Sequence, residues 1–165
     1  MATSQMSEGG LHSCSVQLEH ARRAPTSVDP EDGMLVKTVD TEMGKGLVAS
    51  AAIAAGAIIG RITGTVLTDP EEAPDYAIEV DGVRYLDPEP PFRFTNHSCE
   101  PNAMIAVYDE DVDEVYLEAT RSIAPGEAVC IDYAWPAEYA IPCLCRSRAC
   151  RGWIVDADEL ESLAV

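Results

Sequence analysis

The chain has 165 residues, of which 47% are hydrophobic and 24% are charged, a composition typical of one globular domain. A domain of this length can bury a hydrophobic core without needing disulfides or metals to stabilise it. Its formal net charge is −18, from 29 acidic and 11 basic residues. This negative excess argues against direct nucleic-acid binding and favours basic peptides or proteins as partners.

Two features that the sequence lacks, a membrane-spanning stretch and a secretory signal, bear on the cellular compartment. The longest apolar run, residues 47–60, is shorter than the about 20 residues that a membrane-spanning helix needs. Residues 1–10 are polar and lack the apolar stretch of a secretory signal. We therefore expect a soluble, intracellular protein without a membrane partner. In such a protein six cysteines indicate metal binding or free thiols before disulfides.

Residues 1–33 are rich in Ser, Glu, Pro and Gly and have no sustained period, which predicts a flexible N-terminal arm. Within the arm, residues 16–23 favour a helical turn or two. His12 and Cys14 also lie there, and we interpret them as an incidental imidazole and thiol, because no further ligands are nearby.

From Met34 onward, short apolar runs alternate with turn residues, a pattern that predicts a mostly β fold with few short helices. Asp81-Gly82 is the strongest hairpin signal in the chain, and the acidic residues 109–114 predict a solvated loop within a second hairpin. Residues 157–165 form an acidic C-terminal tail that favours a short helix. The predicted strands cover residues 34–39, 47–50, 57–62, 76–80, 83–86, 103–108, 115–119 and 128–133.

Residues 93–102 read Arg-Phe-Thr-Asn-His-Ser-Cys-Glu-Pro-Asn and are the densest stretch of hydrogen-bonding side chains in the chain. They contain few core residues, and Pro101 favours a turn. Such a stretch is typical of a functional site rather than of scaffold. Taken alone, however, Asn96 and His97 are also compatible with a simple turn cap.

A second cluster, Cys143, Cys145 and Cys150, has the spacing Cys-x-Cys-x4-Cys. A closed zinc site needs four ligands in a tetrahedron, so a remote residue must complete the set. Cys99 and Cys130 are the candidates. Cys130 lies in an apolar strand run typical of a core residue, whereas Cys99 lies in the polar turn, which favours Cys99. The competing interpretation is a set of reduced thiols in a flexible tail.

Five motifs, in order, resemble the SET-domain methyltransferase family with its post-SET zinc segment. Residues 93–102 are similar to the family signature R-F-[I/L]-N-H-S-C-x-P-N, with Thr95 as the one odd position. The other four are Gly44-Lys45-Gly46-Leu47, the strand pair within 57–67, the segment 126–133 that resembles G-E-E-L-T-Y-D-Y, and the Cys-x-Cys-x4-Cys-Arg-Gly of 143–152.

The resemblance implies a β-rich SET fold of several short sheets, with knot-like threading of the C-terminal part. It divides the chain into the arm at 1–33, a SET domain at 34–137, a post-SET zinc segment at 138–156 and the acidic tail at 157–165. It also implies one zinc ion held by Cys99, Cys143, Cys145 and Cys150.

The activity implied by the resemblance is methyl transfer from S-adenosylmethionine to a lysine ε-amine of a histone or another basic protein. Tyr133 then corresponds to the catalytic tyrosine, and Tyr76 to a tyrosine that contacts the cofactor or the lysine channel. The implied cofactor-binding residues are Gly44, Lys45 and Gly46 at the methionine end, Asn96 and His97 at the adenine and amino groups, Arg93 nearby, and Trp153 over the adenine.

Three departures from the family pattern leave the substrate open. Ile131 stands where the family usually has Phe or Tyr, the position that tunes how many methyl groups are added. Ile62 and Thr65 replace a common Tyr and Glu, and the insert between Leu86 and Arg93 is very short. Two alternatives therefore remain: a catalytically silent module that binds basic partners, and an enzyme that acts on a small molecule.

Overall fold

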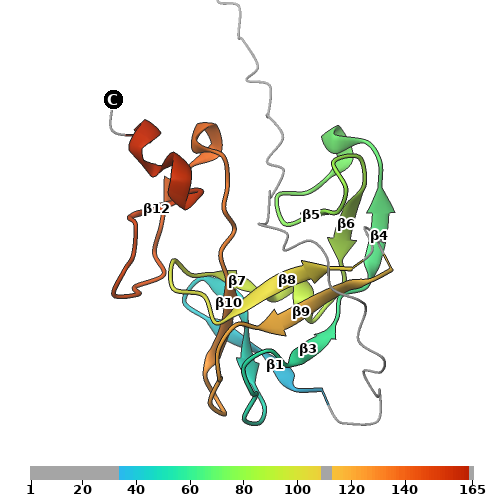
Figure 1. Cartoon of the computed structure of the whole chain (residues 1–165), viewed down its shortest axis with the longest axis vertical. Coiled ribbons are helices and arrows are strands. Elements are labelled where there is room, and N and C mark those ends of the chain that lie inside the picture. Colours follow the sequence, from blue (N-terminus) through green and yellow to red (C-terminus); the bar gives the residue numbers. More distant parts are fainter. Residues whose placement is uncertain (1–33, 109–112, 164–165) are drawn as a thin grey trace, which may run out of the picture.

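A computed structural model of the chain describes residues 34–108 and 113–163 (Figure 1). The predicted arm at 1–33, with its helical turn at 16–23, His12 and Cys14, lies outside the described residues. So does most of the acidic loop at 109–114.

The strands form several small sheets. The largest has four strands in the order β1-β2-β10-β7, where β10 pairs antiparallel with β2 and parallel with β7. Parallel pairing of β7 with β10 places the segment 93–102 directly beside the strand that precedes Tyr133. The four strands are β1 (Val36–Thr41), β2 (Gly44–Ala49), β7 (Asn96–His97) and β10 (Ala128–Ile131).

Two three-stranded antiparallel sheets make up much of the rest (Figure 1). One has the order β3-β9-β8, and its strands are β3 (Ile58–Arg61), β8 (Ala103–Val107) and β9 (Val115–Ala119). The other has the order β4-β6-β5, and its strands are β4 (Gly64–Leu67), β5 (Ile78–Glu79) and β6 (Tyr85–Pro88). A C-terminal hairpin joins β11 (Ile141–Pro142) to β12 (Trp153–Ile154) and carries the Cys143–Cys150 loop.

The helical elements of the described residues are four 3-10 helices: η1 (Pro70–Glu72), η2 (Phe92–Phe94), η3 (Ala137–Tyr139) and η4 (Ala157–Leu163). Within the described ranges, no helix has the length and apolar character needed to cross a membrane. In Figure 1 the β4-β6-β5 sheet and the C-terminal part with β12 and η4 stand on opposite sides of the upper half of the molecule.

One hydrophobic core joins the three larger sheets. Leu47 of β2, Val129 of β10, Leu117 of β9 and Leu86 of β6 are each at most 2% exposed and belong to the same cluster. Along β10, Val129 and Ile131 are buried while Ala128 and Cys130 are not. This alternation is the period of two of a β-strand, so Ile131 and Cys130 face opposite sides.

The structure confirms the mostly β fold, the hairpin around Asp81-Gly82, the β8-β9 hairpin and a short helix in the acidic tail. The first hairpin has a longer loop than a two-residue turn. The backbone hydrogen bond nearest the turn joins the Val80 N–H to the Arg84 carbonyl at 2.9 Å, and the Asp81 carboxylate accepts hydrogen bonds from the N–H groups of Val83 and Arg84. The knot-like threading stays a prediction.

Candidate functional site

The end of β10 carries the central tyrosine of the site. The Tyr133 hydroxyl donates a hydrogen bond to the backbone carbonyl of Thr95 at 2.9 Å, and the Tyr133 N–H donates to Nδ1 of His97 at 3.2 Å. Both partners lie in the segment 93–102, so two hydrogen bonds fix the ring and the backbone of Tyr133 against it. Sequence reasoning found Tyr133 but not the Thr95 carbonyl, since a backbone acceptor leaves no signal in the residue type.

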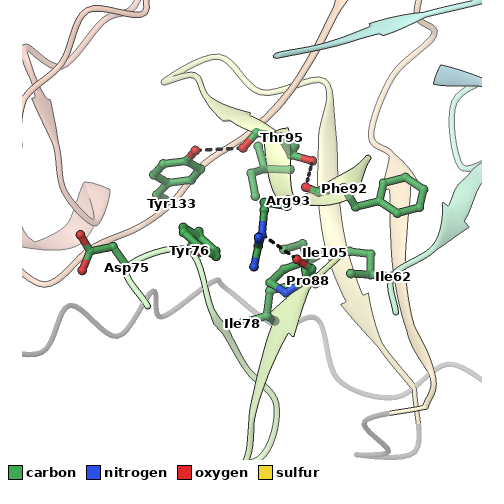
Figure 2. Close-up of a pocket in the computed structure, with 11 residues that line it drawn as sticks. Ile62, Asp75, Tyr76, Ile78, Pro88, Phe92, Arg93, Thr95, Ile105 and Tyr133 are labelled. Atoms are coloured by element: carbon green, nitrogen blue, oxygen red, sulfur yellow. Dashed lines mark hydrogen bonds between the residues drawn. The ribbon is translucent and has the colours of Figure 1, made fainter. Parts of the chain in front are cut away.

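Tyr133 and Tyr76 line one pocket (Figure 2). The empty space in it, which is open to solvent, measures about 410 Å³. Four isoleucines supply much of its apolar wall: Ile62, Ile78, Ile105 and Ile131. Ile62, Ile78 and Ile131 are at most 4% exposed, whereas Tyr76 is 44% exposed. The pocket is therefore a partly open recess with an apolar wall and a tyrosine hydroxyl bound to Thr95.

Arg93 forms part of the pocket wall. Its guanidinium donates to Asp87 Oδ1 at 2.8 Å and to the Pro88 carbonyl at 3.0 Å, and it lies 4.8 Å from the centre of the Tyr76 ring. The hydrogen bond to Asp87 raises the pKa of Arg93, so the guanidinium stays charged. Figure 2 shows Arg93 between Tyr76 and Pro88. The structure thus places Arg93 at the Tyr76 side of the pocket.

A second group of predicted residues meets at the β1-β2 turn. Asn96 donates its side-chain amide to the Lys45 carbonyl at 3.1 Å, and the Lys45 ammonium lies 5.9 Å from the centre of the Phe94 ring. Gly44 has a φ of +100°, which an L side chain would strain. A Cβ on Gly46 would lie 2.8 Å from the Asn96 amide nitrogen, so only glycine allows this close approach.

His97 connects this region to the cysteines. It is 5% exposed, and burial lowers its pKa to about 4 despite the nearby Asp132 carboxylate, so the imidazole is neutral at neutral pH. Its 3.5 Å contact with Asp132 is therefore not an ion pair. Because a backbone N–H can only donate, Nδ1 accepts from Tyr133, and the ring proton lies on Nε2, 3.3 Å from Cys99 Sγ.

The remote cysteine predicted to join the C-terminal cluster does lie beside it. Cys99 Sγ is 3.7 Å from Cys143 Sγ, close to the about 3.8 Å between sulfurs of a tetrahedral zinc–thiolate site. The possible ligand atoms of His97, Cys99, Cys143 and Cys145 all lie within 4.8 Å of one another. His97 fits better as a donor to Cys99 than as a ligand, because its Nε2 carries the proton.

Cys150, the fourth predicted ligand, lies in the same loop but is not among the residues whose possible ligand atoms lie within 4.8 Å of one another. Its sulfur accepts the Gly152 N–H at 3.5 Å, and a hydrogen bond between Cys150 and Cys143 contributes to raising the pKa of Cys143. The sulfurs of Cys99 and Cys143 likewise accept backbone N–H groups, from Arg151 and Cys145. Such N–H groups stabilise thiolates, the form that binds metal.

The pKa values of the clustered cysteine thiols are also compatible with a bound cation. Burial raises the pKa values of Cys99 and Cys143. Burial would raise that of Cys145 too, but hydrogen bonds from the Cys99 backbone and from Ser147 lower it to about 6. Closely spaced thiols cannot all ionise without a compensating positive charge. Cys130 behaves differently: burial raises its pKa to about 11, and it lies outside the metal-ligand group.

Arg151 was not among the predicted site residues. Its guanidinium donates to both carboxylate oxygens of Asp132 at 2.7 Å, and to the Val155 carbonyl at 3.0 Å. Asp132 precedes Tyr133. Nothing in the sequence pairs residues 132 and 151, because only the folded β11-β12 hairpin brings them together.

Trp153 lies on β12 opposite Pro142 and is 40% exposed. The β11-β12 loop also reaches the β1-β2 turn, where Arg146 forms an exposed ion pair with Glu42 at 2.8 Å. An aromatic side chain that stays exposed on this hairpin is available to a ligand. Within the part of the chain that the structure describes, no hydrogen bond or ring contact joins Trp153 to Asn96 or His97.

Comparisons with known proteins place the chain in a family. A SET domain family model matches residues 44–134, more than half of the chain. The chain is 36% identical over 67 residues to an H3 lysine-4 specific histone-lysine N-methyltransferase of Cryptococcus neoformans, covering 38% of this chain and 5% of that protein. It is 32% identical over 127 residues to the histone-lysine N-methyltransferase trithorax of Drosophila virilis, covering 67% of this chain and 3% of that protein.

Among solved structures, KRYPTONITE in complex with mCHH DNA, H3(1-15) peptide and SAH matches with a TM-score of 0.64 at 22% identity. The match covers 72% of this chain and 29% of that chain. At this identity the likeness concerns the fold. The chain spans only a small part of the length of each of these relatives.

Proposed function

The chain belongs to the SET-domain family, and we propose on that basis that it is a protein-lysine methyltransferase that uses S-adenosylmethionine. The observation that carries the proposal is the Tyr133 hydroxyl, held on the Thr95 carbonyl in a pocket with an apolar wall. The cofactor, when bound, supplies an electrophilic methyl group on a cationic sulfur.

The pocket prepares a lysine amine for transfer. A lysine must lose a proton before it can attack, and an apolar wall that includes Ile62, Ile78 and Ile131 disfavours its charged form and lowers its pKa. Because the Tyr133 hydroxyl already donates to Thr95, its oxygen is left to accept an N–H from the amine. This hydrogen bond orients the amine lone pair, and orientation supplies much of the rate of an in-line displacement.

The cofactor would bind on the β1-β2 side of the site. Gly44, Lys45 and Gly46 border it, Asn96 and His97 hold it from β7, and Trp153 covers it from the β11-β12 hairpin. The close approach of Gly46 to Asn96 supports this assignment, since it leaves backbone groups accessible where a side chain would project. Arg93 is held by Asp87 in the pocket wall, so its contribution is to shape the Tyr76 side of the pocket.

The cysteine cluster would hold one structural zinc ion through Cys99, Cys143, Cys145 and Cys150. This assignment divides the chain as the motifs do, into a SET domain at 34–137, a zinc segment at 138–156 and a tail at 157–165. The substrate would be a lysine in a basic protein segment such as a histone tail, which matches a chain with a net charge of −18. A histone substrate implies that the protein is localised in the nucleus.

Transfer of radiolabelled methyl groups from S-adenosylmethionine to histone H3 and to pooled basic peptides would test the proposal. We expect label in a peptide with a free lysine and none in the same peptide with that lysine acetylated. Cofactor binding without transfer to any peptide or protein would instead favour the catalytically silent module. Absence of cofactor binding by a folded, metal-loaded protein would overturn the enzyme assignment.

A further inference from the structure

We propose that Arg151 is a positioning residue that connects the cysteine cluster to Tyr133 through Asp132. The inference rests on the proposed methyl transfer at the Tyr133 pocket and adds a residue to it. Among the described residues, Arg151 does not line the pocket, and its hydrogen bonds go to Cys99, Asp132 and Val155 rather than to the β1-β2 turn. Its role would therefore be to hold Tyr133 in place rather than to bind substrate or cofactor.

Arg151 is tied to the cluster at one end and to Asp132 at the other. Its backbone N–H donates to Cys99 Sγ at 3.4 Å, and its guanidinium binds both oxygens of Asp132 at 2.7 Å. A planar guanidinium that meets a carboxylate with two parallel hydrogen bonds fixes direction as well as distance. The Arg151 side chain is 13% exposed, the least of any lysine or arginine in an ion pair of the described residues.

Asp132, which Arg151 holds in place, fixes the backbone on both sides of Tyr133: it precedes Tyr133 in the chain and accepts a hydrogen bond from Ala134, which follows it. Its side chain accepts the Ala134 N–H at 3.1 Å, and Ala134 has a φ of +46°, a left-handed conformation that alanine rarely adopts. Such a conformation persists only where the surrounding structure over-determines it. Asp132, held by Arg151, is one group that does so here.

A parallel connection runs through His97. Its Nε2 lies 3.3 Å from Cys99 Sγ, and its Nδ1 accepts the Tyr133 N–H. Two routes thus lead from Cys99 to the Tyr133 backbone, one through Arg151 and Asp132 and the other through His97. The ordered cysteine cluster would set the position of the tyrosine hydroxyl at Thr95. Arg151 and Asp132 can both be changed without removing a proposed metal ligand.

The variant Arg151→Lys keeps the charge but replaces the planar fork with a single ammonium. Because Tyr133 would be held less firmly, we expect the single-turnover transfer rate to fall about 10- to 100-fold, the usual effect of losing such a supporting contact. Metal content and the cofactor dissociation constant should not change. The matched control is Arg148→Lys, an exposed arginine of the same segment.

A readout that does not depend on activity is the ¹⁹F NMR spectrum of protein labelled with 3-fluorotyrosine. The Tyr133 resonance is assigned by its absence in Tyr133→Phe. We expect Arg151→Lys to shift or broaden this resonance, Arg148→Lys to leave it unchanged, and chelation of the metal from the wild type to perturb it as Arg151→Lys does. Asp132→Asn, which removes the charge of the other partner, should reproduce the effect and replaces Arg151→Lys if that variant does not fold.

An unchanged Tyr133 resonance in Arg151→Lys would overturn the proposal. So would a rate loss accompanied by an equal loss of metal or of cofactor affinity, since that pattern indicates a general structural defect. If the wild type transfers no methyl group at all, the proposed function fails, and the Tyr133 resonance still decides whether Arg151 positions the tyrosine.

Discussion

The Tyr133 hydroxyl lies 2.9 Å from the Thr95 carbonyl oxygen, and this one hydrogen bond joins the end of β10 to the segment that precedes β7. It also sets the direction of the remaining acceptor position on the Tyr133 oxygen. A hydroxyl whose proton is already engaged can only accept a hydrogen bond from an incoming amine, so it fixes the direction of an amine N–H.

Tyr133→Phe should abolish this orientation with little loss of packing. We expect the transfer rate to fall about 100-fold or more, comparable to the loss of one well-placed hydrogen-bonding group in an active site. Cofactor affinity should stay the same. Tyr116→Phe, which removes a hydroxyl bonded to Glu114 on the β3-β9-β8 sheet, is the matched control. Equal activity of Tyr133→Phe and wild type in single-turnover assays would contradict the catalytic role.

We expect the size of the Ile131 side chain to limit the space next to the Tyr133 hydroxyl. It is 4% exposed and lines the same pocket as Tyr133. Ile131→Phe should fill part of this space, so that the transferred products shift toward fewer methyl groups per lysine. Mass spectrometry of a reacted peptide measures the distribution, and Ile131→Val is the control that enlarges the space slightly. A product distribution that does not differ between Ile131→Phe and Ile131→Val would show that this position does not limit methylation.

Gly46 tests the cofactor side independently of the pocket. A Cβ at this position would lie 2.8 Å from the Asn96 amide nitrogen and 3.1 Å from Thr41 Cγ2. Gly46→Ala should therefore push the Asn96 amide away from the Lys45 carbonyl and weaken cofactor binding. Calorimetric titration with S-adenosylmethionine checks this. Asn96→Ala should give a similar loss, and the double variant no additional one, because both changes remove the same contact.

Residue type and spacing were enough to single out candidate residues that the structure places near one another. The motif at 93–102 and the cysteine spacing led to Asn96 and Cys99, and the family resemblance of segment 126–133 led to Tyr133, because residue types in a fixed order are visible in the sequence. The alternation along β10 also explains why Ile131 reaches the pocket while Cys130 does not.

What the sequence could not predict are contacts between ordinary residues that only the fold brings together. Arg151 and Asp132 are 19 positions apart and look like surface charges until the β11-β12 hairpin closes. The backbone carbonyl of Thr95 has no residue signature. Arg93 was expected beside the cofactor from its motif, but the direction of its side chain depends on Asp87, a residue outside that motif.

The metal assignment makes a prediction about stoichiometry. A four-thiolate site should hold about one zinc ion per chain, measured by atomic emission on purified protein. Cys99→Ser should lose most of this metal, because it removes the ligand that ties the C-terminal segment to residues 93–102. Cofactor affinity should fall with it if the segment carrying Trp153 helps to close the cofactor site. Cys130→Ser should keep its metal, and the opposite result for these two variants would overturn the ligand set.

Glu127 offers a test of stability that does not involve the site. Its carboxylate accepts the Ala124 N–H at 2.9 Å and the Asn102 amide at 3.1 Å, and it pairs with Arg121 at 2.7 Å. The Ala124 hydrogen bond, with the contributions of Arg121 and Asn102, lowers the pKa of Glu127 below its ordinary value of 4.5, and partial burial opposes the shift only in part. A carboxylate with a lowered folded-state pKa stabilises the protein above its unfolded-state pKa.

This stabilisation is lost as the pH falls through 4.5 toward the lower folded-state pKa of Glu127. At neutral pH we expect Glu127→Gln to reduce the free energy of unfolding by about 1 kcal/mol, a modest value because the side chain is partly exposed. The difference between variant and wild type should shrink as the pH falls below 4.5, since protonation of Glu127 removes the charge that its partners stabilise. Urea unfolding across this range measures it, with the exposed Glu72→Gln as control. Acid release of a metal would affect both proteins alike, so a difference that instead grows as the pH falls would contradict the assigned direction of the Glu127 pKa.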